Sequence, residues 1–266
     1  MLELTLRVAT SDAEDVLDAV LPGLPGGAHI RTDGERTSIT VYATPGVPDE
    51  EELRRLAGQR LLGLDRSEAP DDWRKRRLRR YEPLVVAERF VLRPDWAPTT
   101  DEPGLIEIVL EQSAAFGTGL HPTTQACLAT LVETEPGSSF ADYGCGSGVL
   151  SLAAAKLGWS PVVAVDVEET SVEATRRNAE ANAVEINARR LDLTAERPPE
   201  AETIAANIPP HVQQALARRL DRAPALLIAS GFHPQDIPAV AEAWGALGLR
   251  VDDEVRANEW CVLVMR

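Results

Sequence analysis

The feature that most constrains the fold is a set of three glycines at alternate positions, Gly144, Gly146 and Gly148, directly after a short apolar segment. Glycine at this spacing allows a tight turn and a close approach of the backbone to a ligand, and the helix that follows offers free N–H groups. A dinucleotide-binding loop requires G-x-G-x-x-G, and a Walker loop requires a following Lys-Ser or Lys-Thr. The sequence has neither, and Cys145 stands where a G-x-S-x-G loop requires glycine.

Strand and helix patterns alternate around this loop. Strands are expected over residues 139–143, 161–165, 185–191, 203–207, 225–230, 249–254 and 260–265, and helices over 122–134, 148–157, 168–182, 210–220 and 234–247. Apolar strands joined by helices predict a mainly parallel sheet covered on both faces. Only residues 255–259 join the last two strands, so these two must run antiparallel. The prediction is an α/β fold, a Rossmann-like seven-stranded sheet.

The glycine loop also indicates a function class. The pattern D-x-G-x-G-x-G over residues 142–148 is typical of Rossmann-like methyltransferases that use S-adenosylmethionine, and the alternative is a tight strand–helix turn without a ligand. Asp166 ends the next strand, 22 residues after Gly144. A carboxylate there can accept hydrogen bonds from both hydroxyls of a ribose, as in doubly wound folds generally, or it can simply cap the next helix. Together the two features favour a nucleoside site.

Two further segments bring polar groups to the same region. Thr123 lies in the first turn of the helix expected over 122–134, where a hydroxyl and free amides can hold an anion, or merely cap the helix. His121 before it is expected to cap or pack rather than to act as a base. Asn207 ends the strand over 203–207, and its side-chain oxygen can accept a hydrogen bond from an amine. Pro209 and Pro210 are expected to stiffen this loop and aim carbonyls at the same point, the alternative being a rigid loop with a capping Asn.

Residues 1–66 predict a separate small α/β domain. Alternating patterns predict strands over 2–8 and 38–42, and amphipathic patterns predict helices over 11–21 and 49–63. No cluster of His, Cys or paired carboxylates is present there, so a recognition or packing role is expected. Residues 67–98 are expected to form a linker with a basic helix at 71–80, and residues 99–266 the catalytic domain.

Charge excludes some classes of partner. The net charge is −15, divided as −6 over residues 1–70, +3 over 71–100 and −12 over 101–266. Such an acidic chain repels phosphate, so we expect no direct DNA binding and no membrane association, and a basic partner instead. The basic run over 74–80 is either a solvated helix face or a contact for ribosomal RNA or an acidic protein. Three widely spaced cysteines and no apolar span or leader pattern favour a cytoplasmic location, and we expect a monomer without a metal site.

Taken together, these segments resemble the PrmA family, bacterial methyltransferases of large-subunit ribosomal protein eleven. The resemblance covers residues 71–266 and rests on residues 72–73, 93–96, 116–124, 142–148, 166, 207–208, 227–232 and 258–260; over 1–70 only the layout matches. It implies a substrate-recognising N-terminal domain, a flexible linker and methylation of lysine side-chain and N-terminal amines with S-adenosyl-L-methionine. It also implies the cofactor-binding residues Thr123, Gly144, Gly146, Asp166 and Asn207, with Phe116 lining the pocket and Asn207 also facing the amine.

One departure bears on the substrate. In methyltransferases of planar adenine or glutamine groups, a proline directly follows the Asn and an aromatic residue closes the motif. Here Ile208 and His211 fill those places, so an aliphatic amine fits better than a stacked base. The alternatives left open are another protein amine or amide as substrate, a nucleotide-dependent oxidoreductase and a catalytically silent binding module.

Overall fold

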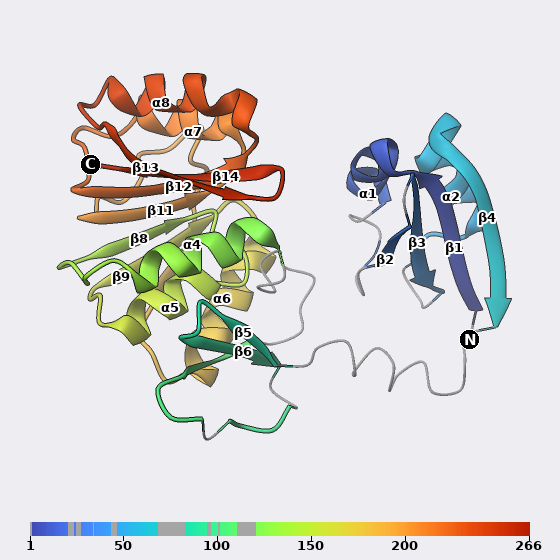
Figure 1. Ribbon diagram of the computed structural model, residues 1–266, viewed down its shortest axis with the longest axis horizontal. Coiled ribbons are helices and arrows are strands. Elements are labelled where there is room, and N and C mark those ends of the chain that lie inside the picture. The colour runs from blue at the N-terminus through green and yellow to red at the C-terminus, as the bar shows by residue number, and fades with distance from the viewer. Residues whose placement is uncertain are drawn as a thin grey trace. The chain divides into compact units, whose positions relative to one another are not determined.

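The computed structural model describes residues 2–20, 24, 28–33, 35–43, 47–68, 83–94, 97–100, 102–110 and 121–266. The chain forms two compact units, Met1–Arg80 and Tyr81–Arg266, each shown in Figure 1. Among the described residues, no helix is long and apolar enough to cross a membrane.

The first unit is a four-stranded antiparallel sheet with two helices. Its strands are β1 (Leu2–Ala9), β2 (His29–Asp33), β3 (Arg36–Tyr42) and β4 (Leu61–Glu68), in the order β2-β3-β1-β4. The helices α1 (Ala13–Val20) and α2 (Glu50–Ala57) are flanked by the 3-10 turns η1 (Thr10–Asp12) and η3 (Gly58–Arg60). Alternate residues of β1 and β3 form one core with both helices, which confirms the small α/β unit.

The helix expected over residues 49–63 is wrong in its second half. It ends at Ala57, since Gly58 adopts a φ of +57°, and Leu61 starts strand β4 beside β1. Leu53, Leu56 and Leu61 do all pack on the same core, although Leu61 reaches it from a strand. The three leucines thus keep helical spacing because all of them face the same core, although only Leu53 and Leu56 lie on a helix.

The linker expected over residues 67–98 is wrong in its second half too. Residues 84–86 and 90–94 form β5 (Leu84–Val86) and β6 (Phe90–Pro94), which join β7 (Ile106–Leu110) in a three-stranded sheet of the second unit. Phe90, Leu92 and Ile108 are buried in a core shared with the main domain. These residues form strands, and not a linker, because their apolar side chains pack in the same core as α4, α5 and the main sheet. The basic helix expected over 71–80 lies outside the described residues.

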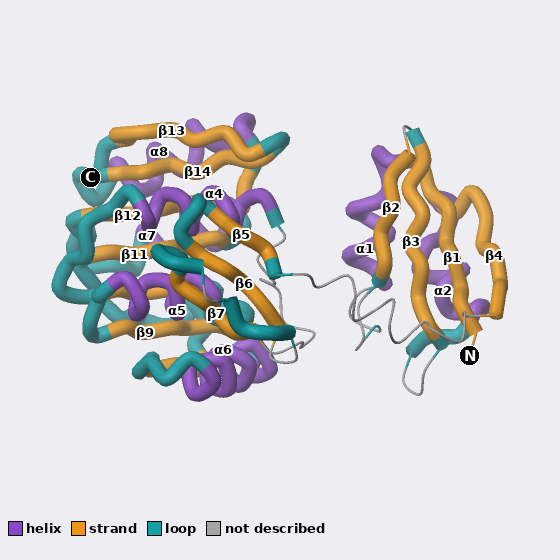
Figure 2. Tube along the Cα trace, turned by 60° about the horizontal axis from the view of Figure 1, so that its bottom comes forward, coloured by secondary structure: helices purple, strands orange, loops and turns teal. Residues whose placement is uncertain are grey.

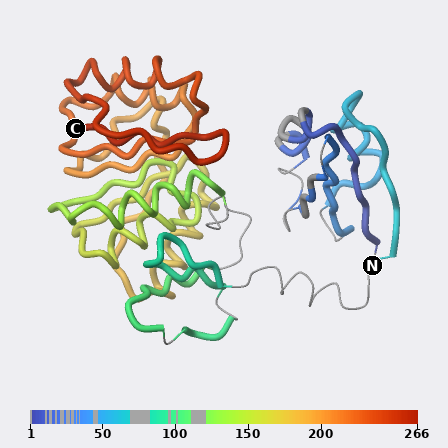
Figure 3. Tube along the Cα trace, in the orientation of Figure 1, coloured from blue at the N-terminus to red at the C-terminus, as the bar shows by residue number. Residues whose placement is uncertain are grey.

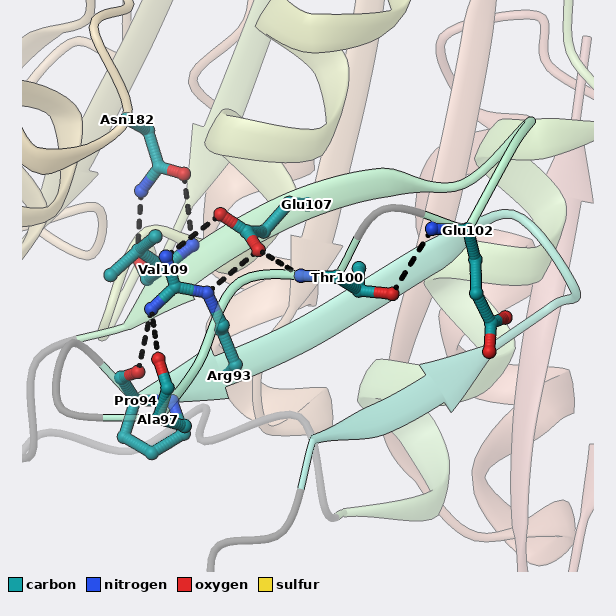
Figure 4. Close-up of polar contacts among 8 residues, drawn as sticks. All are labelled: Arg93, Pro94, Ala97, Thr100, Glu102, Glu107, Val109 and Asn182. Carbon is teal, nitrogen blue, oxygen red and sulfur yellow. Dashed lines mark hydrogen bonds and ion pairs between the residues drawn. The ribbon is translucent and has the colours of Figure 1, made fainter.

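Polar contacts hold this small sheet together and fasten it to the main domain (Figure 4). Arg93, which is 8% exposed, makes an ion pair with Glu107 on β7, with the Nε and Nη2 atoms 2.7 and 2.8 Å from the two carboxylate oxygens. The Arg93 hydrogen bond is the main cause that lowers the pKa of Glu107. Asn182 receives the N–H of Val109 at 2.9 Å and donates to its carbonyl at 2.6 Å. The Asn182 side chain thus satisfies both backbone groups of Val109 at the edge of the sheet, as a neighbouring strand would.

The main sheet has seven strands in the order β10-β9-β8-β11-β12-β14-β13, of which the first five are parallel. Figure 2 shows its strands β9, β11, β12, β14 and β13 in orange. The strands are β8 (Phe140–Tyr143), β9 (Val162–Asp166), β10 (Asn187–Arg190), β11 (Thr203–Asn207), β12 (Leu226–Phe232), β13 (Val251–Ala257) and β14 (Trp260–Met265). The hairpin β13–β14, red in Figure 3, pairs antiparallel with β12. The seven-stranded, mainly parallel sheet and its antiparallel end are therefore confirmed.

Helices cover both faces of this sheet. The helices are α4 (Pro122–Val132), α5 (Val149–Leu157), α6 (Glu169–Ala181), α7 (Pro210–Ala217) and α8 (Ile237–Gly245), with the 3-10 turn η4 (Pro234–Asp236) before α8. Phe140 of β8 packs with α4 and α5, and its neighbour Ala141 packs with α7 and α8 on the opposite face. All five expected helices form, and three of them, α4, α7 and α8, end two or three residues earlier than expected.

Candidate active site

Three adjacent strands bring the predicted polar groups to one edge of the sheet. Strand β8 lies between β9 and β11, and the glycine loop follows its carboxyl end. Asp166 ends β9 on one side, and Asn207 ends β11 on the other. This is the point where the strand order reverses, and open α/β sheets bind ligands in the crevice outside the strand ends there.

The glycine loop needs glycine for its shape. Gly144, Gly146 and Gly148 have φ values of +75°, +54° and +81°, a region that other residues rarely adopt. A Cβ atom on Gly144 would lie 2.3 Å from Cγ2 of Ile208, so the loop also packs tightly against the end of β11. Gly148 then becomes the N-cap of α5, without a side chain over the helix end. Glycine is therefore required here by the backbone conformation and, at Gly144, by the packing against Ile208.

Asp166 ties this loop to strand β9. Its Oδ2 atom accepts a hydrogen bond from the Gly146 N–H at 3.0 Å, and its Oδ1 atom accepts one from the Glu168 N–H at 3.0 Å. An ionised carboxylate has about four lone-pair sites, so both oxygens can accept further bonds. Asp166 thus joins two of the residues that the sequence singled out and keeps acceptor capacity for two hydroxyls.

Asp142 supports the loop from below. Its side chain is 1% exposed, and its Oδ2 atom accepts hydrogen bonds from Ser151 N at 3.0 Å and from Ser151 Oγ at 2.7 Å. Burial raises the pKa of Asp142 to about 6, although the bonds from Ser151 oppose this rise. Asp142 therefore joins the start of the loop to helix α5. Sequence reasoning counted this residue in the motif but gave it no role of its own.

Thr123 and Asn207 meet although 84 residues separate them. The Nδ2 atom of Asn207 donates to Oγ1 of Thr123 at 3.1 Å, and Oγ1 of Thr123 lies 2.6 Å from Nδ1 of His121. His121 caps helix α4, because its Nδ1 atom also accepts the Thr123 N–H at 3.3 Å. The expectation that His121 caps the helix is confirmed. The hydroxyl and amide of Thr123 are both engaged within the chain, so its role as an anion ligand stays a prediction.

Two imidazole rings enclose Trp260 at the start of β14. His121 meets the Trp260 ring edge-on at 5.1 Å between centroids, and His233 stacks on it at 4.2 Å. Burial lowers the pKa of His121, and the charge of Glu259 opposes this shift in part. The net shift favours the neutral imidazole. Sequence reasoning quoted Trp260 only as part of a motif and did not predict this contact.

The loop after Asn207 is fixed mainly by a buried glutamine. Nε2 of Gln213 donates to the carbonyls of Ala206 and Ser230, at 2.8 and 2.9 Å, and so links the ends of β11 and β12. The expectation that the prolines aim carbonyls at the site is wrong for Pro209, whose carbonyl accepts the N–H groups of Val212 and Gln213 in helix α7. The sequence did not predict that Gln213 links the two strand ends, because a glutamine on a helix is usually exposed.

The structure therefore groups the predicted residues into two linked pairs, Asp166 with Gly146 and Thr123 with Asn207. Gly144 lies between the two strand ends. Phe116, predicted to line the pocket, lies outside the described residues.

Comparisons with known proteins bear on what this site does. The family model described as "Ribosomal protein L11 methyltransferase (PrmA)" matches residues 53–266. An Escherichia fergusonii protein named ribosomal protein L11 methyltransferase is 34% identical, with 100% of this chain and 98% of that protein aligned. A Burkholderia multivorans protein of the same name is also 34% identical; there the match covers 69% of this chain and spans 63% of its relative's length.

A solved structure agrees with this similarity. A ribosomal protein L11 methylase from Lactobacillus delbrueckii subsp. bulgaricus superimposes with a TM-score of 0.63 at 26% identity, over 70% of this chain and 98% of that one.

Proposed function

Because this chain belongs to the ribosomal protein L11 methyltransferase (PrmA) family, we propose that it transfers methyl groups from S-adenosylmethionine to amines of ribosomal protein L11. The observation that carries this proposal is the arrangement at the edge of the sheet. A bare glycine loop lies between a carboxylate on β9 and an amide on β11. This arrangement offers one place for a nucleoside and one for an amine.

The chain's own groups fit S-adenosylmethionine. Asp166 already accepts two backbone N–H groups and has lone pairs left for the two ribose hydroxyls. Gly144 and Gly146 have positive φ, so the loop between Asp166 and Asn207 turns without a side chain at either position, and its backbone is suited to lie against the rest of the nucleoside. The cofactor supplies an activated methyl group on a positively charged sulfur, which needs no metal ion or further activation.

The residues of the site then have to deal with the proton of the amine. A lysine amine has a reference pKa of about 10.4, so its neutral form costs roughly 4–5 kcal/mol at pH 7. Burial and a nearby positive charge lower that pKa. Asn207 is suited to hold the neutral amine, since its uncharged oxygen accepts an N–H bond without favouring the ammonium form as a carboxylate would. Orienting the amine toward the methyl group contributes several kcal/mol more to the lowering of the barrier.

We infer lysine side chains and the N-terminal amine as the acceptors. Ile208 follows Asn207 and is 7% exposed, packed in the apolar core of the α7–α8 face. Neither it nor the exposed His211 provides the aromatic platform that a planar amide or base requires. An aliphatic amine needs no such platform, because its chain is flexible and only its nitrogen must be held.

Incubation with labelled S-adenosylmethionine and purified ribosomal protein L11, followed by mass mapping of the product, tests this function. We expect label on lysine and N-terminal amines.

Asp166→Ala should weaken cofactor binding in calorimetry at least about 10-fold, since two charge-assisted hydrogen bonds are lost. Asn207→Ala should reduce the transfer rate about 100-fold, because the amine is no longer oriented toward the methyl group. Absence of heat with both the cofactor and its demethylated product would refute the proposal, and an unaffected Asn207→Ala variant would remove Asn207 from the mechanism.

A further inference from the structure

We propose that His121 is a positioning residue that decides which end of the Asn207 amide faces the substrate amine. This inference rests on the proposed function, because it assigns the orientation of the group that receives the amine. It follows from the direction of three hydrogen bonds that join His121, Thr123 and Asn207.

The first bond fixes the state of the imidazole. The Thr123 N–H can only donate, and it points to Nδ1 of His121 at 3.3 Å. Nδ1 must therefore carry a lone pair and no proton, so His121 is neutral with its proton on Nε2. Burial favours the same neutral state, since it lowers the pKa of this imidazole.

The second and third bonds follow from the first. Oγ1 of Thr123 lies 2.6 Å from the unprotonated Nδ1, so the hydroxyl must donate its only hydrogen to the imidazole. The same oxygen can then only accept from Asn207, at 3.1 Å. Asn207 must therefore turn its NH2 group toward Thr123, which leaves its oxygen directed elsewhere. The buried position of Thr123, 1% exposed, keeps water from replacing either partner.

This direction matters for the chemistry. An amide oxygen accepts a hydrogen bond from a neutral amine and leaves the nitrogen lone pair free for the methyl group. An amide NH2 group would donate to that same lone pair and block it. Protonation of Nδ1 would reverse the direction of the His121–Thr123 side-chain bond and of the Thr123–Asn207 bond. The Asn207 oxygen would then face Thr123, and its NH2 group would face the substrate amine. The charge of Glu259 favours the protonated form of His121, and His233 stacks on the Trp260 ring that His121 also contacts.

Two substitutions at His121 separate the acceptor from the ring. His121→Phe keeps a ring against Trp260 and loses the acceptor. His121→Asn loses the ring and keeps an acceptor in the same place, and Asn is a favoured N-cap. We expect kcat to fall about 10-fold in His121→Phe, because the amide loses its fixed direction, with the affinity for S-adenosylmethionine within about twofold of the wild type. His121→Asn should restore kcat to within about threefold. His233→Phe, which keeps its ring beside Trp260, is the matched control and should change kcat by less than about twofold.

A double-mutant cycle shows whether His121 acts through Asn207. In an Asn207→Ala background, His121→Phe should change kcat by less than about twofold, because no amide is left to orient. Equal losses in the two backgrounds would overturn the proposal. So would a lower kcat in His121→Asn than in His121→Phe, since packing of the ring would then explain the effect.

Nitrogen-15 NMR of the wild-type protein tests the same assignment without an activity measurement, and variants serve only to assign the signals. The chain has only four histidines, so the imidazole signals can be assigned by substitution. We expect His121 to show an unprotonated Nδ1 and a protonated Nε2 at pH 7. A protonated Nδ1 would overturn the proposal even in an active enzyme. An inactive enzyme with the expected signals would instead refute only the proposed function.

Discussion

Gly231 in strand β12 keeps the Asn207 loop in place. Its φ is +89°, and a Cβ atom there would lie 2.7 Å from the backbone nitrogen and 2.8 Å from the carbonyl oxygen of Ile208. These are backbone atoms, which cannot rotate away as a side chain can. We predict that Gly231→Ala lowers the free energy of unfolding by about 2–4 kcal/mol, from strain at positive φ and from overpacking. Urea denaturation measures this loss.

Gly245 provides the matched control. It lies at the end of helix α8, and nothing stands within 4 Å of a Cβ atom placed on it. Gly245→Ala should stabilise the protein by up to about 1 kcal/mol, because alanine loses less backbone entropy than glycine in a helix. Equal effects of the two substitutions would show that the close contact between a Cβ atom at position 231 and the Ile208 backbone does not change the free energy of unfolding.

Asp142 should make stability depend on pH in an unusual direction. Burial raises its pKa in the folded protein to about 6, whereas an unfolded Asp titrates near 3.9. Between these values the folded state binds more protons than the unfolded state, so this group's contribution to stability falls as the pH rises. Relative to Asp142→Asn, the wild type should lose about 2 kcal/mol between pH 4.5 and 7.5. Urea titrations of both proteins at the two pH values give this difference, and a constant difference would place the folded pKa near 3.9.

The sequence predicted those site residues whose role depends on local pattern. The glycine loop and Asp166 belong to two strands next to each other in the chain, and their roles follow from strand ends and turns. The contact between Thr123 and Asn207 depends on how α4 packs over the sheet, which spacing along the chain does not determine. The same holds for the contact between His121, which caps α4, and Trp260 in β14, because these two elements are far apart in the sequence.

At the level of elements, Asn182 joins the small sheet β5–β7 to helix α6. It exchanges two hydrogen bonds with the backbone of Val109 and also donates to the Asn178 carbonyl at 2.8 Å. We predict that Asn182→Ala costs about 1–3 kcal/mol, since two partly buried backbone groups lose their partner. Hydrogen exchange should accelerate in β6 and β7 and stay unchanged in β11 and β12.

An exposed asparagine gives the comparison for this prediction. Asn187 on the edge strand β10 is exposed, so Asn187→Ala should leave exchange in β6 and β7 as in the wild type. Uniform acceleration throughout the unit in Asn182→Ala would mean that Asn182 stabilises the whole domain and not the docking of the small sheet.

Elements with a strong local signal were predicted well, and elements that depend on partners were not. Strands β11 and β14 have the bounds that their apolar runs predict. Strands β5 and β6 are short, and charged residues lie close to them in the sequence. Their sequence therefore resembles a linker, because the core on which they pack is formed by residues elsewhere in the chain. Helix α2 was extended too far because Leu61 keeps helical spacing while it reaches the same core from a strand.

At the level of the whole molecule, the two units have separate hydrophobic cores. The core of the first unit is formed by residues up to Leu64, and the cores of the second by residues from Leu84 onward. We predict that residues 81–266 fold alone and bind S-adenosylmethionine with an affinity within about threefold of the full chain. Methylation of ribosomal protein L11 should be lost, if the first unit recognises that substrate. Full activity of residues 81–266 would contradict the recognition role.

If the proposed function holds, the net charge of −15 should govern how fast this chain meets ribosomal protein L11. Ribosomal proteins are commonly basic, and complementary charge increases the association rate at low salt. We predict that kcat/KM for ribosomal protein L11 falls several-fold, roughly 3- to 10-fold, between 50 and 500 mM salt, because the Debye length shrinks from about 14 to about 4 Å. The value of kcat at saturating substrate should stay constant, since steering acts only before the complex forms. A flat kcat/KM would contradict electrostatic steering, and a parallel fall in kcat would point to an effect of salt on the site itself.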